Sequence, residues 1–136
     1  MSLSSDKEDL IYLAGFLDGE GCFTIYREKI SVTCANTYKP IIDWMKSSFG
    51  GTISTRKARK ENHRVCYSWH LVANNARELL EKLVPYLREK KPQALMLLTY
   101  QQLTKAPKIK RKVNPLVVEE RKRLEKLLVD MKRVSW

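Results

Sequence analysis

The stretch Leu13-Ala14-Gly15-Phe16-Leu17-Asp18-Gly19-Glu20-Gly21 determines how the rest of this 136-residue chain is arranged. Nearly every residue from 10 to 17 is apolar, which predicts a helix that is covered on most of its sides. Ser5 and Glu8 have the spacing of a capping box, so we expect the helix to begin near Asp6. The pattern indicates the end of a buried helix that runs into an acidic, glycine-rich corner.

Small residues form a stripe on this predicted helix. Gly15 and Gly19 lie four residues apart, and Ala14 lies beside them. Because glycine is costly inside an exposed helix, close packing of a second helix backbone is the simplest reason for the stripe. If the stripe packs against its own copy across a two-fold axis, two Glu20 carboxylates converge.

Two acids, Asp18 and Glu20, stand at the C-terminal end of the helix, where the partial negative charge disfavours them. Residues 10–23 contain no Lys or Arg that would offset this charge. A hard divalent cation such as Mg²⁺ suits the position, because free carbonyls at a helix end and a carboxylate are oxygen ligands. The alternative is an apolar helix that ends in a solvated acidic turn.

This stretch resembles the LAGLIDADG motif of the homing endonucleases. Glu20 stands at the catalytic acidic position, where the motif name has Asp, and it keeps the carboxylate on an arm one methylene longer. The positions identical to the motif name are Leu13, Ala14, Gly15, Asp18 and Gly21, and the mild variations are Phe16, Leu17 and Gly19.

The composition favours a polyanionic partner, since the chain has a net charge of +11 and a pI near 9.7. Nucleic acid is the partner that fits best. The apolar runs are too short to span a bilayer, and the N-terminus has no signal-peptide pattern. The odd number of cysteines (Cys22, Cys34 and Cys66) indicates reduced thiols. We therefore expect an intracellular protein of the cytoplasm or an organelle, neither secreted nor bound to a membrane.

Periodicity along the chain predicts the remaining elements. We expect strands over 22–27, 30–34, 52–56 and 65–72, and helices over about 40–48, 75–84, 92–103 and 115–133. A turn is expected at residues 28–29, a helix cap at Thr37, and a basic connector at 105–113. Leu95 and Leu127 are expected to face the core.

This order matches the αββαββα fold of the LAGLIDADG family over about residues 6–104. The resemblance implies an α+β fold whose four-stranded antiparallel sheet forms a DNA-binding saddle, here with an extra C-terminal helix. We expect a single domain over residues 1–136. Because the chain carries one motif, the resemblance also implies a homodimer joined through the motif helix. The candidate interface residues are Ile11, Ala14, Gly15 and Asp18.

The activity implied by the resemblance is site-specific cleavage of both strands of DNA, leaving short 3′ overhangs. Glu20 and the backbone carbonyl of Gly19 would bind Mg²⁺, and Mn²⁺ or Ca²⁺ can substitute in binding. Lys90 falls on the family's basic position, which organises water and stabilises phosphate charge. Arg88 and Lys91 are the fallback choices for that position.

A second polar position of the family lies at the end of the second strand, and Asn36 fits it best. Sequence reading is expected from outward strand residues, because a two-stranded ribbon can enter the major groove, while others contact only phosphates. The candidates are Thr24, Tyr26, Lys29, Ser31, Thr33, Ser54, Arg56, Arg59, Arg64, Ser68 and His70. A homodimer implies a roughly palindromic target, and the family implies the product of an intron.

Two other functions stay open from the sequence. A LAGLIDADG maturase or binding module would bind nucleic acid without cutting it, although the retention of Glu20 and Lys90 favours cleavage. A small basic RNA-binding protein would need no acidic corner. A zinc site at His63, Cys66 and His70 is disfavoured, because the strand period places His63 on the opposite face from the other two.

Overall fold

The structure is a computed structural model that describes residues 6–56, 64–104 and 114–134. Its elements, in chain order, are α1 (Lys7–Glu20), β1 (Gly21–Tyr26), β2 (Lys29–Asn36), α2 (Lys39–Phe49), β3 (Thr52–Arg56), β4 (Cys66–Val72), α3 (Ala73–Leu83), α4 (Lys91–Thr104) and α5 (Pro115–Val134). The predicted α+β fold with the order αββαββα is confirmed, and two helices follow it. The predicted connector at 105–113 and residue Ser5 lie outside the described residues.

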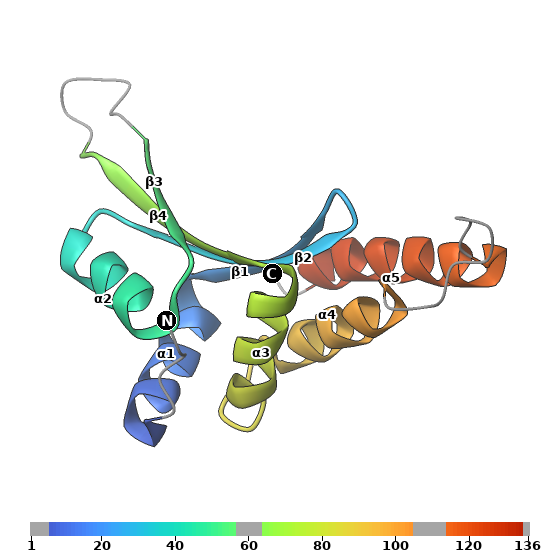
Figure 1. The fold of residues 1–136 in the computed structure, drawn as a ribbon, viewed down its shortest axis with the longest axis horizontal. Coiled ribbons are helices and arrows are strands. Elements are labelled where there is room, and N and C mark those ends of the chain that lie inside the picture. The colour runs from blue at the N-terminus through green and yellow to red at the C-terminus, as the bar shows by residue number, and fades with distance from the viewer. Residues whose placement is uncertain (1–5, 57–63, 105–113, 135–136) are drawn as a thin grey trace.

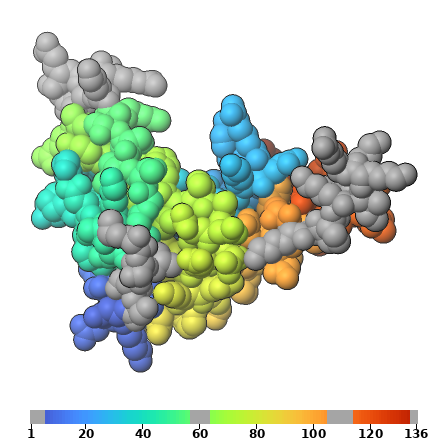
Figure 2. All heavy atoms as spheres, viewed as in Figure 1, coloured from blue at the N-terminus to red at the C-terminus, as the bar shows by residue number. Residues whose placement is uncertain are grey.

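The four strands form one antiparallel sheet in the order β1-β2-β4-β3. Figure 1 shows the helices beneath this sheet, while its upper face carries no described helix. Figure 2 shows that this upper face is hollowed between the β1–β2 hairpin and the β3–β4 end of the sheet. The fold therefore presents the saddle that the resemblance implied.

Alternation along the strands divides the sheet into a buried and an open face, as predicted. Phe23, Val32 and Trp69 point toward the helices and are fully buried. The Trp69 indole Nε1–H donates to the carbonyl of Gly50 at 2.7 Å, which ties the end of α2 to β4. Because these residues fill the space below the sheet, the polar residues between them lie on the open face.

Local hydrogen bonds explain where several elements begin. The Asp6 carboxylate accepts the Glu8 N–H at 2.8 Å, so α1 begins where we predicted, with Asp6 as the cap. The cap predicted at Thr37 is wrong, because the Asn36 Oδ1 accepts the Tyr38 N–H at 2.8 Å instead. An Asx turn at Asn36 therefore precedes α2.

The remaining differences from prediction are small shifts in the bounds of two segments and the exposure of two leucines that were expected in the core. The β1–β2 turn consists of Arg27 and Glu28, both at positive φ, so it lies one residue earlier than predicted. Helix α3 begins at Ala73, two residues before the predicted start. Leu95 and Leu127 are exposed, so their predicted place in the core is wrong.

The last helix packs on the preceding one and joins the common core. Leu124 and Leu128 of α5 are buried in the same cluster as the residues of α1 and the sheet. The Tyr100 hydroxyl of α4 donates to the Glu125 carboxylate at 2.9 Å, and burial together with this bond raises the pKa of Tyr100. Helix α5 is thus held in a defined position. None of the described helices is long and apolar enough to cross a membrane.

Candidate functional site

Glu20 ends α1 with a carboxylate that the chain leaves free. Its side chain is exposed, the last turn of α1 contains no basic residue, and the described part of the chain gives Glu20 no ion-pair partner. Gly21 closes the helix by donating its N–H to the Leu17 carbonyl. A Cβ at Gly21 would lie 2.8 Å from Leu17 atoms, so a close contact requires glycine here.

Asp18, two residues earlier, is fully engaged inside the chain. Its carboxylate accepts the backbone N–H of Arg88 at 2.9 Å and that of Lys90 at 3.0 Å. These bonds fasten the loop between α3 and α4 to the motif helix. We predicted Asp18 as a dimer-interface residue, whereas in the structure its carboxylate serves a contact within the chain.

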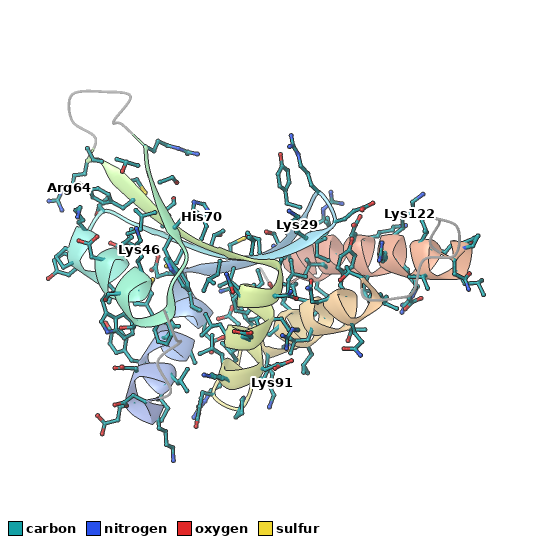
Figure 3. The ribbon with its side chains drawn as sticks, viewed as in Figure 1. Lys29, Lys46, Arg64, His70, Lys91 and Lys122 are labelled. Atoms are coloured by element: carbon teal, nitrogen blue, oxygen red, sulfur yellow. The ribbon has the colours of Figure 1, made fainter. Side chains whose placement is uncertain are left out.

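Lys90 lies beside the end of α1, as the resemblance implied. Its ammonium Nζ donates to the backbone carbonyl of Asp18 at 2.5 Å, and its side chain is half-buried. It lines a pocket of about 360 Å³ together with Gly19 and Gly21. The fallback residues Arg88 and Lys91 are exposed, and Figure 3 shows Lys91 pointing away from the open face of the sheet.

A buried thiol lies within the electrostatic reach of both candidate catalytic charges. Burial and then the negative charge of Glu20 raise the pKa of Cys34, the positive charge of Lys90 opposes them, and the result is a pKa of about 12. Strand pairing places Cys34 directly opposite Gly21. The charges of Glu20 and Lys90, although the residues are 70 positions apart in the sequence, therefore both lie near Cys34.

Asn36 lies at the same end of the sheet. It is two residues beyond Cys34 on β2, so both side chains point to the helix-covered face. Its Oδ1 is taken by the Tyr38 N–H, which leaves the amide nitrogen for another partner. The structure thus gives Asn36 a local structural contact near the candidate site.

The outer face of α1 is apolar and lies open. Ile11 is 46% exposed, and a Cβ built on Gly15 or Gly19 meets nothing within 4 Å. Tyr12 is exposed as well, and its ring contacts that of Trp44 on α2 with centroids 5.4 Å apart. The predicted interface residue Ala14 is wrong, because it is 0% exposed and its side chain fills the chain's own core.

The open face of the sheet carries the residues predicted to contact DNA. Ser54 Oγ and His70 Nε2 lie 3.0 Å apart on neighbouring strands, and Figure 3 shows Lys29 and His70 on this face. Ser31 is only 9% exposed, so the structure does not support its prediction as a contact residue. Arg59 lies outside the described residues. The other candidates, all exposed or half-exposed, are Thr24, Tyr26, Thr33, Arg56, Arg64 and Ser68.

A family model described as LAGLIDADG endonuclease matches residues 13–107. The chain belongs to this family. The match begins at the first residue of the motif and runs past the end of α4, so it contains Glu20 and Lys90. No curated protein matches the chain.

Solved structures show the same LAGLIDADG architecture. The homing endonuclease I-CvuI, in complex with its target in the presence of Ca, is 25% identical, with 91% of this chain and 82% of that chain covered and a TM-score of 0.71. The archaeal intron-encoded homing endonuclease I-Vdi141I, complexed with DNA, is 18% identical, with 91% and 84% covered and a TM-score of 0.69. The homing endonuclease I-TnaI is 16% identical, with 91% and 93% covered and a TM-score of 0.61.

The donor set at the end of the LAGLIDADG helix fits half of a divalent cation site. The Leu17 carbonyl accepts the Gly21 N–H and the Asp18 carbonyl accepts Lys90, whereas Gly19 and Glu20 are exposed beyond them. Oxygen donors at the negative end of a helix suit a hard cation. The described residues contain no group of three His, Cys, Asp or Glu side chains that could hold a metal ion.

Sequence reasoning missed four residues that line the pocket beside Lys90. They are Cys22 on β1, Glu89 just before α4, Gln93 at the start of α4 and Lys132 near the end of α5. Lys132 lies far from the motif in the sequence and outside the family match, so no spacing or resemblance pointed to it. The sequence showed only that the chain as a whole carries a net positive charge.

Proposed function

We propose that this protein is a homodimeric, site-specific DNA endonuclease that makes a Mg²⁺-dependent double-strand break in a long, roughly palindromic target, leaving short 3′ overhangs. The observation that carries the proposal is the convergence of Glu20 and Lys90. The Lys90 ammonium donates to the Asp18 carbonyl at 2.5 Å, two residues before the exposed and unpaired carboxylate of Glu20 at the end of the motif helix. Opposite charges of this kind suit a phosphodiester that must be bound and hydrolysed.

Each residue has a distinct part in this proposal. Glu20 and the Gly19 carbonyl of each subunit would hold the cation, which would lower the pKa of water and neutralise phosphate charge. Lys90 provides positive charge near the scissile phosphate, and its backbone contact with Asp18 fixes the position of its loop. Asn36 provides its free amide nitrogen to the water around the phosphate.

A second copy of the chain would complete the site. The outer stripe of α1, with Ile11, Gly15 and Gly19, lets the backbones of two motif helices approach closely. Two Glu20 carboxylates at close range repel each other unless a cation lies between them. Dimerisation and metal binding therefore support each other in this proposal, and each strand of DNA meets its own Lys90.

The hollow face of the sheet is the proposed DNA-binding surface. It carries polar and basic side chains, and the chain has a net charge of +11. I-CvuI is described in complex with its DNA target in the presence of Ca, and with another target in the presence of Mg, where the DNA is not cleaved. A similar use of this face would let β-strand side chains read the major groove. The three free cysteines suit a reducing, intracellular setting.

The first experiment is cleavage of a library of plasmids with randomised, roughly palindromic inserts, with Mg²⁺ or with EDTA. We expect double-strand breaks at a few related sequences only with Mg²⁺, and cleavage at least about a hundredfold slower from the Glu20→Gln variant. Cleavage that continues in EDTA, or that Glu20→Gln retains at the wild-type rate, would overturn the mechanism. Binding without cleavage in both Mg²⁺ and Mn²⁺ would instead favour a maturase or a binding module, to be tested on intron RNA.

A further inference from the structure

Lys132 brings a positive charge from the C-terminal helix to the end of the motif helix. Its ammonium Nζ lies 3.6 Å from the Sγ of Cys22, the second residue of β1. It lines the same pocket as Asp18, Gly19 and Lys90. The last turn of α5 and the last turn of α1 therefore meet at one pocket, although the contacting residues are 110 positions apart.

The two lysines of this pocket differ in what they contact. Lys90 is engaged, because its ammonium donates to the Asp18 carbonyl at 2.5 Å. Lys132 has only the Cys22 sulfur, a weak acceptor, and in the described residues it forms no ion pair. Its ammonium therefore remains available to an anion that enters the pocket, whereas the ammonium of Lys90 already donates to a carbonyl.

The surroundings hold Lys132 in place and add a polar wall. Leu128, one turn earlier on α5, is buried in the core, and the Tyr100–Glu125 hydrogen bond fixes the helix against α4. Gln93 is 8% exposed, and its Oε1 has no hydrogen-bond partner in the described part of the chain. The pocket thus presents a positioned ammonium to an anion, beside the unpartnered acceptor Gln93 Oε1, and the carboxylates of Asp18 and Glu89 also line it.

We propose that Lys132 binds a DNA backbone phosphate next to the scissile one, which makes α5 a part of the DNA-binding site. The proposal rests on the proposed nuclease function, because it assumes that DNA reaches the end of α1. An ammonium–phosphate contact is a charge-assisted hydrogen bond, and it needs no change in the backbone of either helix. Helix α5 then has a function beyond covering α4.

The salt dependence of DNA binding tests this contact without requiring cleavage. The probe is a mixed-sequence duplex, titrated at a series of KCl concentrations with the wild type, Lys132→Met and Lys7→Met. Lys7 is an equal charge at the start of α1, at the end farthest from the sheet (Figure 1). We expect Lys132→Met to reduce the slope of log K against log salt by about 1.8, which is about 0.9 for the one phosphate that each subunit of the dimer contacts, and Lys7→Met to leave it unchanged.

A cleavage measurement separates this inference from the proposed function. On a target recovered with the wild type, we expect Lys132→Met to weaken binding or slow single-turnover cleavage about tenfold and Lys132→Arg to restore most of it. A wild type that cuts no DNA would overturn the nuclease proposal and leave the slope result standing. A slope identical to wild type in folded Lys132→Met, checked by circular dichroism, would overturn the Lys132 assignment even if the enzyme cuts.

Discussion

The inner and outer faces of α1 differ in almost every property. The inner face buries Leu10, Leu13 and Leu17 in the core of the chain. The outer face leaves Ile11 exposed and presents Gly15 with open space above it. A helix that was built only to stabilise its own domain would carry polar side chains on the outer face. One face of α1 therefore builds the domain, while the other leaves an apolar surface open, which is the face we propose as the dimer interface.

The same division separates the two acids of the motif. Two residues correspond to about 200° around a helix, so Asp18 and Glu20 point to nearly opposite sides. Asp18 accepts two backbone N–H groups of the α3–α4 loop, whereas Glu20 is exposed and unpaired. One carboxylate is structural and the other is available for chemistry, although both belong to the same short motif.

Glu20→Gln tests whether the Glu20 carboxylate is required for cleavage, and it has the largest expected effect. We expect cleavage to fall at least about a hundredfold, because the amide loses the charge that holds the cation. DNA binding should persist, and the free energy of unfolding should rise by about 0.3–1 kcal/mol, since a carboxylate at a helix C-terminus is unfavourable. Cleavage rates and urea unfolding measure the two effects. A control, Glu119→Gln on α5, should leave cleavage at the wild-type rate.

Gly15→Arg tests whether the outer face is the dimer interface. The side chain has open space in the single chain, so we expect the fold to be retained and even stabilised by about 1 kcal/mol through helix propensity. Dimerisation should weaken by more than about tenfold, because the stripe no longer admits a second backbone. Analytical ultracentrifugation measures the mass.

Gly21→Ala is the matched control for this test. Its Cβ would lie 2.8 Å from Leu17 atoms, so it should lower the free energy of unfolding by about 1–3 kcal/mol without a bulky group on the stripe. A Gly15→Arg variant that remains dimeric to the same extent as wild type would contradict our placement of the interface.

Asp18→Asn tests whether the Asp18 carboxylate stabilises the fold. Only one amide oxygen remains to accept two backbone N–H groups, so we expect the free energy of unfolding to fall by about 1–3 kcal/mol. The control is Asp43→Asn, which breaks an exposed ion pair of 2.7 Å with Lys39 and should cost less than about 0.5 kcal/mol. Equal losses for the two variants in urea unfolding would show that Asp18 is an ordinary surface acid.

The smallest expected effect is the contribution of the Glu20 charge to the pKa of Cys34, which the pH dependence of stability measures. The pKa of Cys34 is raised from 9.0 to about 12 in the folded chain, first by burial and then by the charge of Glu20. Between these two pKa values the unfolded chain has lost a proton that the folded chain keeps. Stability therefore falls as pH rises through this window, by up to about 1.4 kcal/mol per pH unit from this thiol.

Variants isolate the contribution of the thiol to this slope. Unfolding measured from pH 8 to pH 11 should show a shallower slope for Cys34→Ala than for wild type, because alanine has no proton to lose. Glu20→Gln should lower the pKa of Cys34 in the folded chain, whereas Asp18→Asn should not. Identical slopes for wild type and Cys34→Ala would mean that the thiol is not protected in the folded state.

Local signals were sufficient for most of the fold. The β3 strand occupies the predicted residues, and α1 begins at Lys7, next to the expected start near Asp6, because alternation and capping depend on residues within one turn or one strand. The errors arose where the deciding neighbour is distant. Leu95 and Leu127 have the spacing of core residues, but only the packing of α4 and α5 shows that these positions face outward.

The sequence by itself determined the motif, its free carboxylate Glu20, the candidate Lys90 and the family, because residue type and spacing suffice for these. The tertiary structure alone decided that Asp18 binds a loop some 70 positions away, that Ala14 faces the core, and that Lys132 reaches the pocket from α5. The physical reason is that side-chain direction on a helix follows from local geometry, whereas the atoms it meets are set by the packing of the whole chain.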